Sequence, residues 1–331
     1  MRVTYPGYGT PLASVPVPEL RRDELSGRLV LLAPERAARP HTVRSPEPDA
    51  RAADADCPFC PGNEQLTPPE VYRTGGGEPD APGWRVRVVP NLYPIVGGAD
   101  AGPGATGSHE VVMLSPAHAD SFAQLDDAQA TEVLTVLRDR VRHHLRAGHV
   151  FVQVAINHGR AAGASIQHPH AQIVALDLVP PAVDQAVERF EASGRNPVIA
   201  DLDGAGGGLS LVDGPVAAWC PRAGSTPYEL RLALRAAGAR FDEAGDDDMQ
   251  RFAGASRSVL ARLAAATGDA PYNLVVHTAP PGAGSRSFHW YVEVQTRITV
   301  PAGFEQGTGI LVNTVPPERA AQELREAAQP G

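Results

Sequence analysis

The chain has 331 residues, of which 43% are hydrophobic and 20% charged, and its formal net charge is −9. This length allows one large domain or two ordinary ones, and the core needs no disulfides or lipid. An acidic chain without basic clusters is not expected to bind the backbone of DNA or RNA. All 29 basic residues are Arg, which excludes enzymes that need a Lys amine, such as pyridoxal-phosphate enzymes and Walker P-loop ATPases.

The sequence also predicts a cytoplasmic protein that does not enter a membrane. The N-terminus lacks the apolar segment of a signal peptide, and no stretch approaches 18 apolar residues. The three cysteines, Cys57, Cys60 and Cys220, are an odd number and do not have the spacing of a secreted disulfide framework.

Hydrophobic patterning predicts an alternation of strands and helices along the chain. A strand at 29–32 precedes a long loop, from about 40 to 83, that contains the first two cysteines. The next predicted elements are strands at 84–89 and 110–114, a helix at 123–146, and strands at 150–156 and 170–176. The segment 179–220 is predicted to be irregular, with the glycines of 204–208 forming a flexible turn.

This order of elements then repeats, which indicates duplication of one strand–helix–strand–strand unit. The paired segments are 110–122 with 229–241, 152–156 with 273–276, and 168–172 with 289–293. The first copy has His168 and His170 where the second has His289 and Tyr291. We therefore expect the first half to carry the chemistry and the second to be mainly scaffold.

The segment Cys57-Pro58-Phe59-Cys60 has the spacing of a metal-binding knuckle. Two thiolates on a tight turn can supply half of a tetrahedral zinc site, and two further ligands are needed. Because the chain has no second C-x-x-C, those ligands would have to be His. A redox pair is the alternative, but such a pair normally opens a helix, which Pro61 and Gly62 oppose. The spacing alone leaves both interpretations open.

A second group of polar residues occupies the start of a predicted strand. His168, His170 and Gln172 alternate, so their side chains project from the same face. Pro169 cannot donate to a strand ladder, which indicates a sheet edge or a bend. Three polar residues on one face indicate a site, and a strand face exposed to solvent is the structural alternative.

Together these motifs resemble the galactose-1-phosphate uridylyltransferase family, within the histidine-triad superfamily of nucleotidyl transferases and hydrolases. The resemblance covers about residues 21 to 325, and its main motifs are Cys57 to Glu64, Ser115 to His118, Asn157-x-Gly159, and Gly163 to Gln172. It implies an α+β fold built from a duplicated histidine-triad-like unit, with antiparallel strands in an open half-barrel and helices outside. Residues 1–185 would carry the zinc site and the nucleophile. Residues 186–331 would form a degenerate repeat that contributes to the sugar-phosphate site.

The resemblance also implies roles for individual residues. One Zn²⁺ would be bound by Cys57, Cys60, His118 and His168. His170 would attack the α-phosphorus of a nucleotide sugar while its Nδ1–H donates to the His168 carbonyl, and Gln172 would donate to a phosphoryl oxygen. The residues implied in substrate binding are Arg36, Arg39, Phe59, Leu66, Asn91, Asn157, Gly163, Ser165, His289, Phe304 and Glu305.

Some of these residues have other interpretations. Arg36 and Arg39 can be ordinary surface residues or can reach the site of a neighbouring subunit, and Phe59 can be a core residue. Some family members bind a second metal through a His-x-His pair and a Glu. Here Tyr291 replaces the second His and no carboxylate lies near Ala186, so we expect no second metal.

The expected activity is exchange of a nucleoside monophosphate, UMP, between a UDP-sugar and a sugar 1-phosphate through a covalent nucleotidyl-histidine. One alternative is a phosphorylase of a nucleotide sugar or dinucleotide, such as ADP-glucose with inorganic phosphate as the acceptor. Another is a nucleotide-binding homologue without turnover. The resemblance further implies a homodimer active in carbohydrate metabolism.

Overall fold

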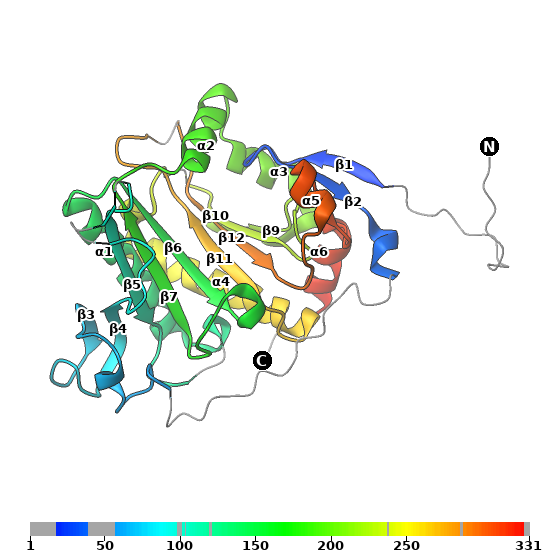
Figure 1. Cartoon of the computed structure of the whole chain (residues 1–331). Helices are drawn as coiled ribbons and strands as arrows, with labels where there is room; N and C mark the ends of the chain where they lie inside the picture. The colour runs from blue at the N-terminus through cyan, green and yellow to red at the C-terminus, as the bar shows by residue number, and fades with distance from the viewer. Residues whose placement is uncertain are drawn as a thin grey trace, which may run out of the picture.

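A computed structural model describes residues 18–38, 57–97, 101–102, 104–118, 121–236, 238–284 and 287–327. Its centre is a ten-stranded antiparallel sheet (Figure 1). The strands lie in the order β3 (Tyr72–Gly75), β4 (Trp84–Pro90), β5 (Gly107–Met113), β7 (His170–Leu176), β6 (Phe151–His158), β11 (Tyr272–His277), β12 (Tyr291–Thr296), β10 (Leu230–Leu234), β9 (Val216–Trp219) and β8 (Ser210–Val212). The sheet is open, with β3 and β8 at its edges.

The strand order is symmetric about the central pair of β6 and β11. Ala155 lies opposite Val275 across this pair, and the next strand outward places Gln172 opposite Ala155 and Glu293 opposite Val275. Gln172 and Glu293 therefore occupy equivalent positions in the two halves of the sheet. The predicted α+β fold, with a repeated unit, an open antiparallel sheet and helices outside it, is confirmed.

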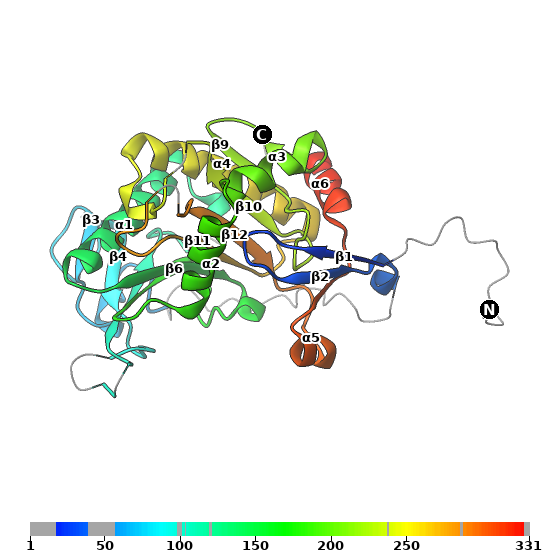
Figure 2. The ribbon, with the colours of Figure 1, turned by 90° about the horizontal axis from the view of Figure 1, so that it is seen from above.

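Two long helices, α1 (Asp127–Arg146) and α4 (Asp246–Thr267), pack against each other and cover one face of the sheet (Figures 1 and 2). The Asp126 side chain caps α1 by accepting from the Gln129 N–H. Val133, Leu137 and Val141 recur every four residues along α1 and are buried. This spacing presents an apolar stripe to the sheet and explains why the helix forms at the predicted place.

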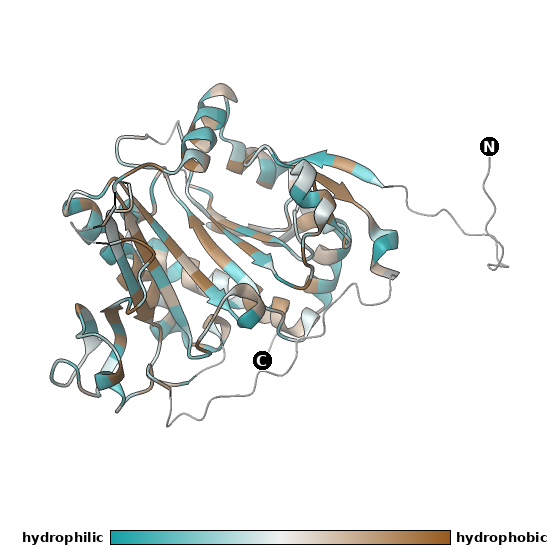
Figure 3. Ribbon diagram, in the orientation of Figure 1, coloured by the Kyte–Doolittle hydropathy of each residue, from teal (hydrophilic) through white to brown (hydrophobic). Residues whose placement is uncertain are grey.

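Alternation along the strands gives the sheet two different faces, and it appears as bands of hydrophobic and hydrophilic residues (Figure 3). In β7, Ala171, Ile173 and Ala175 are buried in the core beneath the helices. Because neighbouring residues of a strand point in opposite directions, His170 and Gln172 project from the other face. The fold therefore places these two polar side chains on the face that α1 and α4 leave uncovered.

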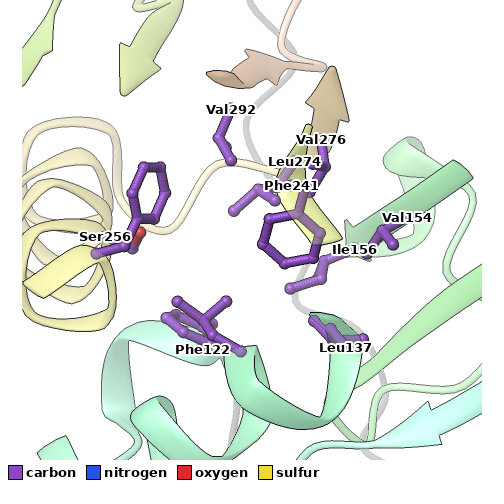
Figure 4. Close-up of a pocket in the computed structure, with 11 residues that line it drawn as sticks. Phe122, Leu137, Val154, Ile156, Phe241, Ser256, Leu274, Val276 and Val292 are labelled. Carbon is purple, nitrogen blue, oxygen red and sulfur yellow. The ribbon is translucent and has the colours of Figure 1, made fainter. Parts of the chain in front are cut away.

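The core between the helices and the sheet encloses a cavity of about 20 Å³ (Figure 4). Phe122, Leu137 and Phe241 line it together with strand residues such as Val276, and Ser256 is the polar exception. An apolar cavity of this size stays dry because a water molecule would find too few polar partners in it. The cavity is a packing defect of the core and not a substrate pocket.

A three-stranded sheet covers part of the opposite face. It consists of β1 (Glu19–Arg22), β2 (Leu29–Leu32) and β13 (Leu311–Asn313), with β2 and β13 parallel. Asp23, directly after β1, bonds to Arg231 of β10, which ties this small sheet to the large one. The short helix α5 (Gly303–Thr308) precedes β13, and α6 (Pro317–Glu326) follows it.

The prediction of an irregular segment at 179–220 is wrong. This segment forms α2 (Pro181–Ala192) and α3 (Pro197–Leu209), each with Pro near its first position, followed by β8 and β9. Each Gly in a helix costs about 1 kcal/mol relative to Ala, so the glycine-rich sequence of α3 does not indicate a helix. Burial of Val198, Leu202 and Leu209 outweighs this cost. The expected turn survives as a kink at Gly206, where φ is 53°.

No helix in the described part of the chain is both long enough and apolar enough to span a bilayer.

Candidate active site and metal centre

Cys57, Cys60, His118 and His168 come together in one cluster, with their possible ligand atoms within 4.8 Å of one another. The Cys60 Sγ lies 3.3 Å from His118 Nδ1 and 3.5 Å from His168 Nδ1. Ordinary zinc bond lengths and tetrahedral angles place sulfur and nitrogen ligands about 3.6 Å apart. The residues predicted from the resemblance therefore form a group that could hold a metal ion.

The tautomer of His168 is determined by its surroundings. Its Nε2–H donates to the Ser115 carbonyl at 2.7 Å, so Nδ1 carries no proton and faces Cys60. A metal-binding imidazole commonly makes this second hydrogen bond, which fixes its orientation. His168 is fully buried, so its ring has no alternative partner in solvent.

The turn that carries the two cysteines is braced by its own neighbours. Both oxygens of the buried Glu64 accept hydrogen bonds of 2.9 Å, one from Trp84 Nε1 and one from the Gly62 N–H. The Asn63 amide donates to the Cys57 carbonyl at 2.8 Å. These bonds preorganise the knuckle, a function that the sequence motif did not reveal because Trp84 is distant in sequence.

His170, the predicted nucleophile, lies at the start of β7 directly beyond this cluster. Its Nδ1–H donates to the His168 carbonyl at 2.8 Å, as expected, and Nε2 has no hydrogen-bond partner among the described residues. Burial lowers the pKa of His170, which favours the neutral imidazole. Phe59 packs edge-on against the ring at 5.3 Å between centroids. A neutral imidazole with an unprotonated Nε2 can act as a nucleophile.

Strand register and one loop bring further polar groups next to His170. Asn157 follows Ile156, which pairs with Ala171, so it lies beside His170 on the neighbouring strand. The Asn273 side chain donates to Asn157 Oδ1 at 2.7 Å and to the Ala162 carbonyl at 2.8 Å, which anchors the loop between β6 and β7. The same loop contains Gly163, whose φ of 91° favours glycine, and the exposed Ser165.

Gln172 and Asn91 are linked through a residue that the sequence analysis missed. His109 Nε2 lies 2.9 Å from Gln172 Oε1, and Asn91 Nδ2 lies 3.1 Å from the same nitrogen. A single His within an apolar strand belongs to no recognisable motif. Only the pairing of β5 with β7 places it next to Gln172.

Several other predicted substrate-binding residues have exposed side chains or lie outside the described part of the chain. Arg36 lies exposed in a short 3-10 helix, and Arg39 is outside the described residues. Leu66 follows the cysteine knuckle but is 52% exposed. Phe304 and Glu305 belong to α5, which lies away from β7 (Figure 1).

His289 lies three strands along the sheet from β7 and is bound on both sides by protein groups. Asn196 Nδ2 donates to its Nδ1 at 2.8 Å, and its Nε2–H donates to the Leu234 carbonyl at 2.9 Å. The Asn196 side chain also caps α3. These bonds give His289 a structural function in joining α3 to β10.

Comparison with known proteins agrees with this geometry. Residues 101–180, which contain β5, α1, β6 and β7, match the family model for the N-terminal domain of galactose-1-phosphate uridyl transferase. The chain is 30% identical over 334 residues to ADP-glucose phosphorylase of Arabidopsis thaliana, which covers 94% of this chain and 93% of the relative. The chain belongs to the galactose-1-phosphate uridylyltransferase family. The galactose-1-phosphate uridylyltransferase of Thermotoga maritima is 24% identical over 93% of this chain and 98% of its own length.

Solved structures of family members share the whole fold. The crystal structure of the Arabidopsis thaliana ADP-glucose phosphorylase with bound ADP-glucose superposes with a TM-score of 0.82 at 28% identity, covering 95% of this chain and 99% of that one. A uridylyltransferase structure gives a TM-score of 0.72 at 25% identity, with 93% and 97% covered. The family is thus one of nucleotidyl-transferring enzymes, and the prediction of an enzyme of this class is confirmed.

Proposed function

We propose that this chain transfers a nucleoside monophosphate from a nucleotide sugar to a phosphate-bearing acceptor through His170. The observation that carries this proposal is the buried His170, whose Nδ1–H is held by the His168 carbonyl and whose Nε2 bonds to none of the residues that the structure describes. In the first step Nε2 forms a bond to the α-phosphorus, and the bond from that phosphorus to the bridging oxygen breaks, which releases the sugar 1-phosphate. In the second step an acceptor oxygen attacks the same phosphorus and the phosphorus–nitrogen bond breaks, which regenerates the neutral imidazole.

The proposed division of labour follows the two halves of the chain. Residues 1–185 carry the nucleophile and the metal cluster, and residues 186–331 contribute scaffold and part of the acceptor site. Gln172 donates to a phosphoryl oxygen, where charge grows as the phosphorus is attacked. Asn157 and Ser165 bind the phosphates, and Phe59, Leu66 and Asn91 line the nucleoside site.

Zinc is the metal that we propose for the cluster, because two thiolates and two imidazoles suit a closed tetrahedral zinc site. Zinc bound there would hold His168, and with it the turn that presents His170, in one orientation. We expect about one zinc per chain, and Cys60→Ser should lose most of it because a closed site needs all four ligands. Elemental analysis of the purified variants measures this directly.

Cys220→Ser is the matched control for the zinc prediction. Cys220 is also buried, but it lies outside the cluster, and burial raises the pKa of its thiol to about 12, so it remains protonated. This variant should keep the zinc content of the parent chain. Full zinc content in Cys60→Ser would contradict the proposed ligand set.

One observation favours a particular pair of donor and acceptor. The relative that is 30% identical over nearly the whole chain is an ADP-glucose phosphorylase, whereas the Thermotoga maritima uridylyltransferase is 24% identical. We therefore propose ADP-glucose and inorganic phosphate as one substrate pair, with glucose 1-phosphate and ADP as products. A UDP-sugar with a sugar 1-phosphate is the pair expected from the sequence, and UDP-glucose with galactose 1-phosphate represents it as the second candidate.

A comparison of two assays distinguishes these substrate pairs. Incubation with ADP-glucose and phosphate should release ADP and glucose 1-phosphate if the chain is a phosphorylase. Incubation with UDP-glucose and galactose 1-phosphate should yield UDP-galactose if it is a uridylyltransferase. Intact-protein mass spectrometry with each nucleotide sugar alone should show the corresponding adenylyl or uridylyl adduct. Absence of both adducts in zinc-loaded protein would contradict the covalent mechanism for these substrates.

We further propose that the enzyme is a cytoplasmic homodimer. Arg36, Arg39 and the α5 residues Phe304 and Glu305 would then serve the site of the partner subunit. The separate positions of α5 and β7 within one chain support this arrangement (Figure 1).

A further inference from the structure

His109 is positioned to control the orientation of the Gln172 side chain. In the antiparallel pair of β5 and β7, Val111 lies opposite Gln172 and His109 lies opposite Val174. His109 is therefore the diagonal neighbour of Gln172 on the same face of the sheet, within reach of a long side chain. His109 is 5% exposed and its Nε2 lies 2.9 Å from Gln172 Oε1.

The hydrogen bonds around His109 determine which of its nitrogens carries the proton. The Ile95 N–H points at His109 Nδ1 at 3.3 Å, so Nδ1 must act as an acceptor. Asn91 Oδ1 accepts from the Tyr93 N–H at 2.9 Å, and Asn91 Nδ2 lies 3.3 Å from His109 Nδ1 and 3.1 Å from Nε2, so this contact does not distinguish the two ring nitrogens and the Ile95 N–H alone decides the tautomer. A neutral imidazole has one N–H, and with Nδ1 accepting it lies on Nε2. Burial lowers the pKa of His109, which favours this neutral form.

The Nε2–H of His109 therefore donates to Gln172, and this decides the direction of the Gln172 amide. An amide presents an acceptor oxygen at one corner and donor hydrogens at the other. With its oxygen held by His109, Gln172 must present its NH₂ group toward the open face beside His170. The opposite orientation would place an oxygen lone pair against a phosphoryl oxygen and repel the developing charge.

We propose that His109 is a positioning residue for nucleotidyl transfer, which holds the Gln172 amide with its donor toward the phosphorus attacked by His170. This inference rests on the proposed function of His170. The Ile95 N–H in turn holds His109 through Nδ1, so the loop after β4 is coupled to the reaction centre through one imidazole. His109 does not contact the reacting atoms itself.

The test compares His109→Leu with His109→Gln. Leu removes the donor, whereas Gln can place an amide N–H close to the position of the imidazole Nε2–H. We expect His109→Leu to slow formation of the nucleotidyl-His170 adduct about 10- to 100-fold, the size of effect typical of losing a residue that orients a metal ligand. His109→Gln should recover most of the rate. The measurement is a rapid-quench time course of adduct mass with saturating nucleotide sugar.

A double-mutant cycle separates positioning from a general structural effect. Gln172→Ala should slow adduct formation about 10²- to 10³-fold, because it removes a donor to the developing charge. If His109 acts through Gln172, adding His109→Leu to Gln172→Ala should cause no further loss. Zinc content and urea unfolding of each variant show whether it is folded.

His149→Leu serves as the matched control, because His149 also bonds to another side chain, Asp177, but just before the start of β6, at the opposite end of β7 from His170. It should leave the adduct rate unchanged. An equal loss in His109→Leu and His109→Gln with folding intact, or a full further loss in the Gln172→Ala background, would overturn the inference. Failure of the parent chain to form any adduct would instead overturn the proposed function.

Discussion

Replacing His170 with Ala is expected to abolish turnover, with a loss on the order of 10⁴- to 10⁶-fold, as seen when a catalytic nucleophile is removed from other enzymes. The variant keeps the metal cluster and the strand pairing of β7 but lacks the nitrogen that accepts the nucleotidyl group. The neighbouring His168 cannot replace it, because His168 donates through Nε2 to Ser115 and directs Nδ1 at Cys60. The nucleotidyl adduct should therefore disappear together with turnover.

The measurement is steady-state turnover alongside adduct mass for the parent and the His170→Ala chains. His143→Ala is a suitable control because His143 lies on α1, on the opposite face of the sheet. It should retain both the adduct and the parent rate. If His170→Ala still transferred nucleotide at the parent rate, the covalent mechanism would be wrong.

Arg231→Met is expected to lower the free energy of unfolding by about 3–5 kcal/mol, because it leaves buried carboxylates without their counter-charge. Arg231 is 1% exposed and makes two 2.9 Å bonds to Asp23, with Asp201 at 3.0 Å and Glu293 at 3.2 Å. Burial disfavours the ionised form of Asp23, but the charge and hydrogen bonds of Arg231 outweigh this effect. The pKa of Asp23 is therefore lowered. Burial and the charge of Glu293 raise the pKa of Glu229, also in this cluster, to about 8.

Urea unfolding at pH 7 measures this loss, and Arg235→Met is its matched control. Arg235 lies directly after β10 and pairs with Asp213, but both side chains are exposed, so the pair should contribute less than about 1 kcal/mol. A loss in Arg231→Met no greater than in Arg235→Met would contradict the structural role of the cluster. Asp23 binds Arg231 from outside the large sheet, so the variant should also loosen the small sheet of β1, β2 and β13.

The cluster that Arg231 forms with Asp23, Asp201 and Glu293 shows how the two halves of the repeat differ. Glu293 occupies the position in the second half that Gln172 occupies in the first. Gln172 faces the open side of the sheet beside His170, whereas Glu293 is buried against Arg231 and Asp23. The predicted correspondence of 168–172 with 289–293 is borne out by the strand register. In the second half, Asp23 from near the N-terminus covers this position by bonding to Arg231. The sequence could not predict this contact, because the two residues are about 200 positions apart.

Features that depend only on residues close together in the sequence could be predicted from it. Alternation in 168–172 places His170 and Gln172 on one face, because side-chain direction in a strand follows from backbone geometry alone. The helix at 127–146 follows from its four-residue apolar spacing. The metal cluster came from the resemblance, since the C-x-x-C spacing supplies two ligands and leaves the others open.

Features that depend on strand register and packing were decided by the tertiary structure. His109 contacts Gln172 only because β5 pairs with β7 in one particular register, and a shift of one residue would turn its side chain to the other face. Asn273 reaches Asn157 for the same reason at the centre of the sheet. The glycine-rich α3 forms because burial of its apolar side chains outweighs weak local propensity. The sequence by itself determined which side chains could do the chemistry, and long-range pairing determined which of them meet, because contact energies between distant segments leave no local pattern.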